Sequence, residues 1–349
     1  MGNVRIEIRQ FVCNMTTHKQ SKLIHNYYPF LRKTNIIPLK KGNNTNSKNY
    51  LLTNTDKKYV LKILPDKSYP YRINKICQIL QYCIENNNYV LEPVANKKKS
   101  YFTVELNGYL TKYYPGQTYR AKQGELQDVS RNIAYLHKTL LKCPINFNYK
   151  PNNSYYKILK KSELNTIKRI IQNKKFKTKF DIYLTKNIPA LQYQFKNFKI
   201  MNKTIKKKKL RKQLIHYDLQ PSNVIFKNNE VQAIIDFDAM RKGYLIEEVA
   251  FSSFRFSSFN NNSTIMIANK LRLFLKKYVL INPLTKEERK CYFFFLRKNI
   301  LEKISYILKK YYFVTDKSWS SDINKNIEFL KLIDKLESVM KGNFLINLV

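Results

Sequence analysis

A single β-hairpin interrupts the helical last two thirds of this sequence, and this interruption constrains the fold most. Residues 223–240, "NVIFKNNEVQAIIDFDAM", read as a short strand, a turn and a return strand. Around it, apolar residues recur at helical spacing, as in "LQDVSRNIAYLHKTL" at 126–140. A helical region that contains one short hairpin indicates an α+β protein.

The first third of the sequence is instead rich in strand patterns. "YVLKIL" at 59–64 alternates as a half-buried strand does, and only residues 73–84 have helical spacing there. The pattern changes at Pro115-Gly116. The sequence therefore predicts two lobes. Residues 1–115 form an N-lobe with a five-stranded antiparallel sheet and one helix, and residues 116–349 form a mostly helical C-lobe.

Polar residues with metal-binding and acid–base chemistry flank the hairpin. Asp218 and Asn223 lie in the Pro-containing loop before it, and Asp236 ends the return strand. Because a hairpin returns its second strand beside its first, Asp236 is expected near Asn223. One carboxylate can then orient a hydroxyl, while a carboxylate and an amide hold a divalent cation, as phosphoryl transfer requires. Taken alone, Asp218 and Asn223 are more typical of turns and loop caps.

Two features of the first third fit the phosphates of ATP. Lys62 lies in "YVLKIL" among apolar residues, where an ammonium group is costly without an anionic partner. Gly42, in "KKGNNTNSKNY", is suited to bring backbone N–H groups to phosphates. A lysine that keeps an edge strand soluble is the alternative interpretation of Lys62.

Five motifs in this order resemble those of the aminoglycoside phosphotransferase/choline kinase superfamily, which has a protein-kinase-like fold. They are "YVLKIL", "KYYPGQ", "NIAYLHK", "IHYDLQPSN" and "IIDFDA". They are similar to the nucleotide lysine strand, the hinge, a helix with a Leu-His pair, the catalytic loop and the metal-binding strand end. The resemblance covers nearly the whole chain. The order of the later segments is similar to that of the CotS-type spore-coat kinase-like branch.

The resemblance implies an ATP- and Mg²⁺-dependent kinase that acts on a hydroxyl of a small-molecule or sugar-like acceptor. Asp218 would be the catalytic base or hydroxyl-orienting residue, and Asn223 and Asp236 would hold Mg²⁺. Lys62 would contact the ATP phosphates beneath the loop of Gly42. The fold would be a two-lobed α+β protein-kinase-like fold.

The resemblance also implies supporting roles and shows departures. His216 would brace the catalytic loop, and Glu248 would make structural hydrogen bonds. The family usually pairs the strand lysine with a glutamate on the next helix, but "RINKICQ" has no acid and Glu85 lies near the helix end. No Asp-Phe-Gly follows the loop, which argues against a regulated protein kinase. A catalytically weak structural protein, for instance in a spore coat, is therefore the rival hypothesis.

The positive charge of the sequence is concentrated in its middle. The net charge is +41, and residues 129–217 hold 23 Lys and Arg against Glu163 and Asp181, a net +21. Such a surface attracts polyanions, and a polyanion-binding module is a third hypothesis. A solvated helix face is the alternative interpretation of the run Lys206 to Lys209. The same charge disfavours polycationic acceptors and favours neutral or anionic ones.

The cysteines and the apolar runs indicate a cellular location. Five scattered cysteines without a C-x-x-C pair suggest free thiols in a reducing compartment, hence the cytoplasm, with the spore coat as the alternative. No apolar run reaches the roughly 18 residues of a membrane span. We therefore expect no membrane-spanning segment.

Overall fold

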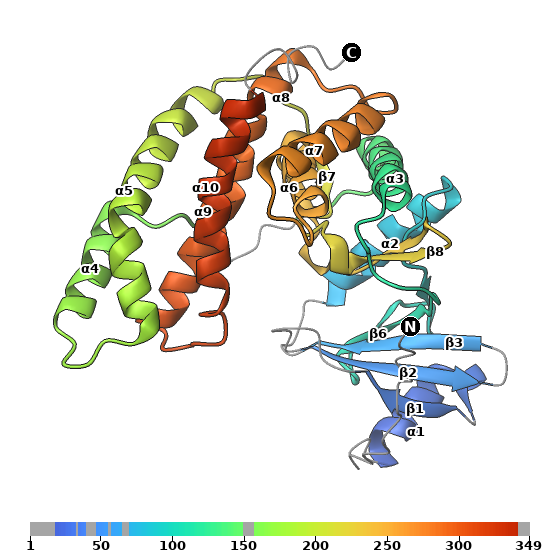
Figure 1. Cartoon of the computed structure of the whole chain (residues 1–349). Coiled ribbons are helices and arrows are strands. Elements are labelled where there is room, and N and C mark those ends of the chain that lie inside the picture. Colours follow the sequence, from blue (N-terminus) through green and yellow to red (C-terminus); the bar gives the residue numbers. More distant parts are fainter. Residues whose placement is uncertain are drawn as a thin grey trace, which may run out of the picture. The chain divides into compact units, whose positions relative to one another are not determined.

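The computed structural model describes residues 18–32, 34–39, 47–54, 57–64, 70–148 and 157–340. The chain divides into two compact units (Figure 1). Unit 1 comprises residues 1–74 and 93–113, and unit 2 comprises residues 75–92 and 114–349. Helix α2 (Pro70–Glu85) begins in unit 1 and continues into unit 2.

Unit 1 is built around an antiparallel sheet with the strand order β1-β2-β3-β6-β4, and β5 also pairs with β6. The strands are β1 (Asn35–Pro38), β2 (Lys48–Asn54), β3 (Lys57–Ile63), β4 (Pro93–Val94), β5 (Phe102–Thr103) and β6 (Gly108–Lys112). Leu61 is fully buried in β3, between half-buried Val60 and Lys62, as the alternation in the sequence predicts. Six strands are described instead of the five predicted.

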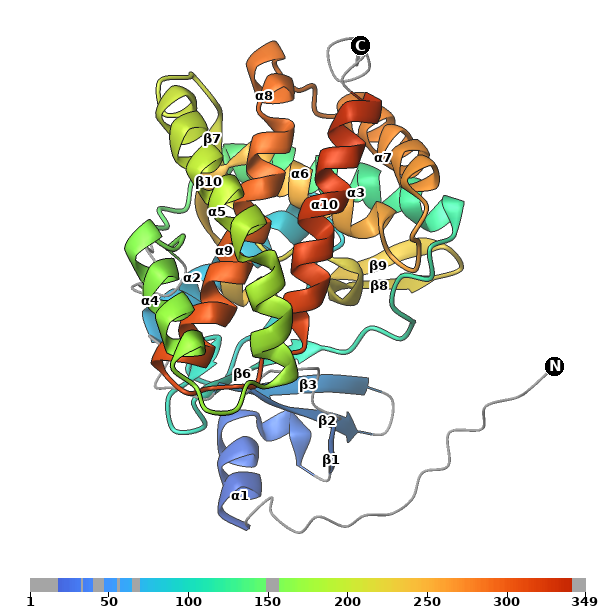
Figure 2. The same ribbon diagram turned by 60° about the vertical axis from the view of Figure 1, so that its left-hand side comes forward.

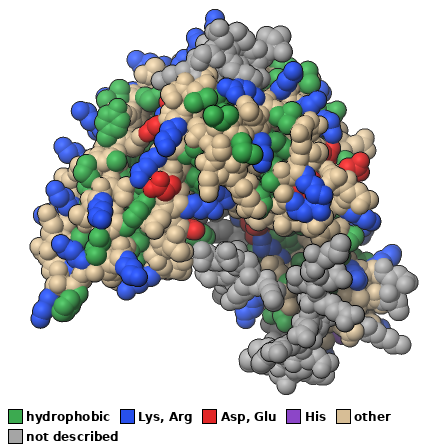
Figure 3. All heavy atoms as spheres, in the orientation of Figure 1, with side chains coloured by type: hydrophobic (Ala, Val, Ile, Leu, Met, Phe, Trp, Pro, Cys, Tyr) green, Lys and Arg blue, Asp and Glu red, His purple; other side chains and the backbone are tan. Residues whose placement is uncertain are grey.

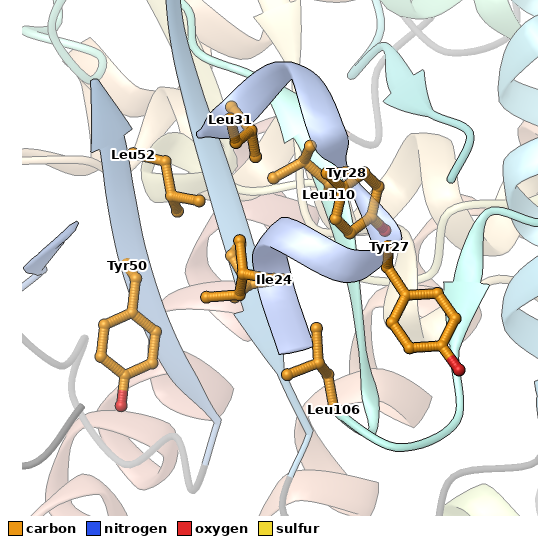
Figure 4. Close-up of a cluster of buried hydrophobic side chains, with 9 residues drawn as sticks. Ile24, Tyr27, Tyr28, Leu31, Tyr50, Leu52, Leu106 and Leu110 are labelled. Atoms are coloured by element: carbon orange, nitrogen blue, oxygen red, sulfur yellow. The ribbon is translucent and has the colours of Figure 1, made fainter. Parts of the chain in front are cut away.

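Helix α1 (His18–Tyr27) completes the core of unit 1 and was not indicated by the sequence pattern. Figure 4 shows Ile24, Tyr27 and Tyr28 beside the buried side chains of the sheet, among them Leu52 and Leu110. The helix is rich in polar residues, so its apolar face is narrow. Packing against the sheet stabilises a short helix that its own sequence would leave marginal.

Unit 2 is mostly helical. Helix α6 packs against α7 and α9, α9 also packs against α5 and α10, and α3 packs against α7 (Figures 1 and 2). The helices are α3 (Gln123–Lys142), α4 (Lys161–Gln172), α5 (Lys179–Ile205), α6 (Leu245–Ser257), α7 (Thr264–Val279), α8 (Lys286–Lys290), α9 (Tyr292–Phe313) and α10 (Asp322–Met340). Among the described residues, no helix combines the length and the apolar character needed to cross a membrane.

Two strand pairs interrupt these helices. The predicted hairpin is present as β8 (Val224–Lys227) and β9 (Glu230–Ile234). The second pair, β7 (Lys212–Ile215) with β10 (Arg241–Tyr244), was not predicted. Its partners are separated by the whole hairpin, so the short-range pattern of the sequence does not show the pairing.

The sequence of residues 180–213 reads mostly as helix, and this prediction is wrong at its end. Helix α5 ends at Ile205, and Lys206 to Lys209 form an exposed turn that leads into β7. Lysine favours helices, but Lys206 and Lys209, three positions apart, would face each other on a helix surface and repel. The lysine run is therefore a basic turn and not a helix face.

Candidate active site

The loop between β7 and β8 has a constrained backbone. Tyr217 has φ of 71°, in the left-handed region that bulky residues rarely adopt. Its hydroxyl donates to Glu302 Oε2 at 2.9 Å, and the guanidinium carbon of Arg241 lies 3.2 Å from the centre of its ring. Contacts on both ends of the side chain thus hold Tyr217 in this unusual conformation.

His216 braces the loop against the end of the hairpin. Its Nδ1 accepts the N–H of Asp218 at 3.2 Å, and its Nε2 donates to the carbonyl oxygen of Ile235 at 2.9 Å. The ring also packs against Phe237, with 4.4 Å between the ring centres. These contacts agree with the bracing role predicted for His216.

Glu248 on α6 anchors the same loop through hydrogen bonds to its backbone. It is only 2% exposed, and its carboxylate accepts the backbone N–H groups of His216, at 2.9 Å, and of Tyr217. His137 Nε2 lies 2.8 Å from the same carboxylate. Burial alone would raise the pKa of Glu248, but the hydrogen bond from His137 and the neighbouring histidine charges lower it. The structural hydrogen bonds predicted for Glu248 are therefore present.

Replacing Glu248 with Gln should destabilise the protein at neutral pH by about 1–3 kcal/mol, because an amide N–H₂ would face donors that now meet an acceptor. The lowered pKa fixes the sign of the pH dependence. Stability from the ionised Glu248 is present above its unfolded-state pKa and is lost as the pH falls through its folded-state pKa. Unfolding curves of the parent and the variant should therefore converge in acid. A difference that stays constant with pH would contradict the assignment.

The structure brings Asp218, Asn223 and Asp236 together in unit 2. Asn223 Nδ2 donates to the backbone oxygen of Asp218 at 2.8 Å and to its Oδ2 at 3.0 Å. The carbonyl oxygen of Asn223 accepts the N–H of Ile235 at 2.9 Å, which sets Asp236 one residue beyond this contact. Asp236 has φ of 66°, a second left-handed residue. The hairpin therefore brings Asp236 near Asn223, as its sequence predicts.

Asp218 uses its two carboxylate oxygens differently. Oδ2 accepts from Asn223 and from Gln220 Nε2, the latter at 3.1 Å. Within the described part of the chain, Oδ1 accepts no hydrogen bond. Burial raises the pKa of Asp218; the charge of Lys303 opposes this, and the charge of Asp236 adds to it. One oxygen is thus fixed, and the other is left for a further donor such as a hydroxyl.

The donor set near Asp236 fits a magnesium ion. The amide nitrogen of Asn223 faces Asp218, so its Oδ1 points elsewhere and can act as a hard oxygen ligand together with the carboxylate of Asp236. The described residues contain no group of three or more His, Cys, Asp and Glu side chains that could hold a metal. Magnesium commonly uses one or two carboxylates, substrate phosphates and water, so two protein ligands are sufficient.

Comparison with known proteins identifies the family. The phosphotransferase enzyme family matches residues 36–264, which is more than half of the chain and includes the whole loop and hairpin. The chain belongs to the phosphotransferase enzyme family. The predicted membership of this superfamily and the predicted kinase-like enzyme class are confirmed. The assignment to the CotS-type branch stays a prediction, and no curated protein matches the sequence.

Solved structures show that this phosphotransferase has the predicted fold. Amicoumacin kinase in complex with AMP-PNP, Ca²⁺ and Ami matches with a TM-score of 0.62 at 15% identity, over 92% of this chain and 94% of that chain. Spectinomycin phosphotransferase with ADP and spectinomycin gives 0.62 at 15% identity, over 95% and 96%. Ethanolamine kinase of Plasmodium vivax gives 0.52 at 15% identity, over 94% and 89%. The two-lobed α+β kinase-like fold is confirmed.

The residues predicted to contact the nucleotide lie in the first third of the phosphotransferase. Lys62 is half-buried in β3, where it faces Asn49 in β2 and Tyr109 in β6. Gly42 lies outside the described residues. In α2, the acid nearest to the expected position is Glu85, an exposed residue of the last turn that accepts from Gln81 Nε2. The helix that follows the strand of Lys62 therefore has no acid at the position where the family usually has the glutamate partner of this lysine.

Two basic residues of the phosphotransferase near Asp218 were missed by the sequence reasoning. Arg255 on α6 donates to Gln220 Oε1 at 3.0 Å, and the charge of Lys303 on α9 acts on Asp218. Arg255 had a detectable signal, because it is the one charged residue between Glu248 and Lys270. Lys303 had none, since lysines are frequent and α9 is remote in the sequence.

Proposed function

We propose that this phosphotransferase transfers the γ-phosphoryl group of ATP, with Mg²⁺, to a hydroxyl of a small-molecule or sugar-like acceptor. The observation that carries the proposal is the carboxylate of Asp218. Its Oδ2 is fixed by Asn223 and Gln220, while its Oδ1 accepts nothing from the described residues. This is the arrangement needed to orient a hydroxyl and take up its proton.

The proposed reaction uses the chain's residues as follows. Oδ1 of Asp218 accepts the hydroxyl proton while the acceptor oxygen forms a bond to the γ-phosphorus, and the bond to the β-phosphate oxygen breaks to release ADP. Asn223 and Asp236 would hold Mg²⁺, and Lys62 would contact the phosphates of ATP. When bound, the metal ion neutralises the charge of the phosphates. Related folds have been solved with AMP-PNP and with ADP, which supports ATP as the donor.

The direct test combines binding and turnover. Mg²⁺ and ATP together should raise the melting temperature of the chain, because a ligand that binds only the folded state must stabilise it. ADP release should then depend on an added hydroxyl compound. A chain that gains no stability from Mg²⁺ and ATP, and releases no ADP with any hydroxyl compound tested, would not be the proposed enzyme.

A catalytically weak, kinase-like structural protein, such as a spore-coat protein, is the second candidate. The observation in its favour is α2, which lacks an acid in its first turn.

A cytoplasmic location belongs to the first candidate. It is supported by the free cysteines Cys77, Cys83, Cys143 and Cys291 among the described residues.

Replacing Lys62 with Met should weaken ATP binding by about tenfold or more, the effect of losing one charge-assisted contact. Met keeps the apolar stem, so β3 should remain folded. Calorimetric titration with Mg²⁺ and ATP gives the dissociation constant. Lys58→Met, in the same strand but exposed, is the matched control. Unchanged affinity in Lys62→Met would remove Lys62 from the nucleotide site.

We also propose a polyanion contact through residues 129–217. Figure 3 shows many Lys and Arg side chains over α4 and α5, and the turn of Lys206 to Lys209 is exposed apart from Lys208, which pairs with Glu287. Replacing these four lysines with Gln should lower the salt concentration that elutes the chain from heparin. The control replaces Lys270, Lys276, Lys277 and Lys286. Equal shifts in both variants would point to net charge alone.

A further inference from the structure

Three basic side chains from three helices of unit 2 lie within electrostatic range of one another. They are Arg255 on α6, Lys303 on α9 and Lys325 on α10. Helix α9 packs against both α6 and α10 (Figure 2). Arg255 is the best placed, because Gln220 accepts its Nη2 at 3.0 Å and donates to Asp218 Oδ2 at 3.1 Å. One side chain thus separates this guanidinium from the proposed catalytic carboxylate.

Lys303 has no anionic partner at ion-pair distance among the described residues. It is half-buried, with its ammonium 4.5 Å from the centre of the Phe251 ring, and makes no hydrogen bond or ion pair within the described residues. Burial lowers the pKa of Lys303 to about 8, although the negative charge of Asp218 opposes this. Yet the two groups are not within ion-pair distance. The ammonium and the carboxylate attract each other without direct contact.

Arg255 also has an unsatisfied donor. Its Nε is buried and has no hydrogen-bond partner within the described residues. A guanidinium that uses one N–H₂ group on Gln220 and leaves Nε unpaired is costly unless an anion completes its contacts. Nε and the adjacent N–H₂ can together bind one phosphate or carboxylate.

The acids around these groups do not balance them. Asp218 and Asp322 are the carboxylates whose charges act on Arg255 and Lys303. Lys325, exposed at the start of α10, adds a third cation. Asp218 is needed for the acceptor hydroxyl, so of these two carboxylates Asp322 remains to offset the three cations. An ammonium-bearing acceptor would be repelled here, while an anionic acceptor would be attracted.

We propose that Arg255 and Lys303, with Lys325 at the rim, form a subsite for an anionic group of the acceptor, so that the substrate is a hydroxyl compound carrying a phosphate or carboxylate. The inference rests on the proposed function, since the subsite lies beside Asp218. It also meets a requirement of that reaction. An anionic acceptor approaching the ATP phosphates meets like-charge repulsion, and the cations beside Asp218 offset it.

The test uses three acceptors with one carbon skeleton and different charges: glycerol, glycerol 3-phosphate and 3-amino-1,2-propanediol. ADP release is measured for the parent, for Lys303→Met and for Lys276→Met, an exposed lysine of α7 that loses the same charge. We expect the parent to favour glycerol 3-phosphate. Lys303→Met should lower the ratio of its kcat/KM to that of glycerol by about tenfold, through KM. Lys276→Met should behave as the parent.

Other outcomes overturn the subsite. If the parent prefers the ammonium compound or glycerol, it has no anionic subsite. The same conclusion follows if Lys303→Met lowers the activity with all three acceptors equally. Lys303→Arg, which keeps the charge, should retain the preference and shows that loss in Lys303→Met is not a folding defect. Melting curves without ligands check the fold of each variant.

If none of the three compounds is phosphorylated, binding of inorganic sulfate tests the subsite. Sulfate replaces chloride at constant ionic strength, and the rise in melting temperature is compared between variants. A rise that is lost in Lys303→Met and kept in Lys276→Met supports the subsite, and an equal rise in all chains overturns it. The stability gain from Mg²⁺ and ATP, measured in the same melts, reports separately on the proposed function.

Discussion

Asp218→Asn is expected to lower turnover by about two to four orders of magnitude while leaving Mg²⁺-dependent ATP binding unchanged. The asparagine can keep its oxygen toward Asn223 and Gln220, which now donate to Oδ2. Its amide nitrogen then occupies the place of Oδ1, where it cannot take up the hydroxyl proton. ADP release and calorimetric titration measure the two quantities separately.

The matched control for Asp218→Asn is Asp334→Asn, the same chemical change at an exposed position of α10. This variant should have the turnover of the parent. Equal, measurable turnover in the parent and in Asp218→Asn would refute the catalytic role. A parent that binds Mg²⁺ and ATP poorly, with neither substitution mattering, would identify a kinase-like structural protein.

Asp236→Ala is expected to abolish Mg²⁺-dependent ATP binding, because it removes the only carboxylate in the proposed metal site. The stability gain from Mg²⁺ and ATP in thermal melts should disappear with it. The backbone adds a second effect. Alanine in the left-handed conformation of residue 236 costs about 1–2 kcal/mol, so the variant should also melt earlier without ligand.

Asp236→Asn separates these two effects. Asparagine tolerates the left-handed conformation, so this variant should melt like the parent without ligand and still lose most of the gain from Mg²⁺ and ATP. Binding that persists in both variants would move the metal site away from Asp236. Calcium in place of magnesium tests whether the loss concerns divalent cations in general.

The hairpin was predictable because its signals are local. Asn228 and Asn229 form its turn with φ of 53° and 66°, a conformation that asparagine tolerates better than most residues. The strand of Lys62 was likewise readable from alternation over a few residues. Since Asp218, Asn223 and Asp236 all flank this hairpin, their proximity followed from the same local pattern.

The basic residues around Asp218 were not predictable, because their proximity depends on helix packing. Lys303 acts on Asp218 because α9 packs against α6, although the two residues lie 85 positions apart in the sequence. In a chain with 65 Lys and Arg, one more lysine carries no signal. The pairing of β7 with β10 and the docking of α1 were not predicted either, because both depend on contacts between segments that are distant in the sequence.

The anchoring of the catalytic loop by Glu248 has a consequence for how the enzyme folds. The N–H groups of His216 and Tyr217 find their acceptor on α6, a helix that comes about 30 residues later in the chain. That carboxylate supports the left-handed backbone of Tyr217, together with the contacts that Glu302 and Arg241 make with its side chain. The loop therefore cannot take its active shape until α6 has docked, and a chain emerging from the ribosome acquires its chemistry only after that helix has been synthesised.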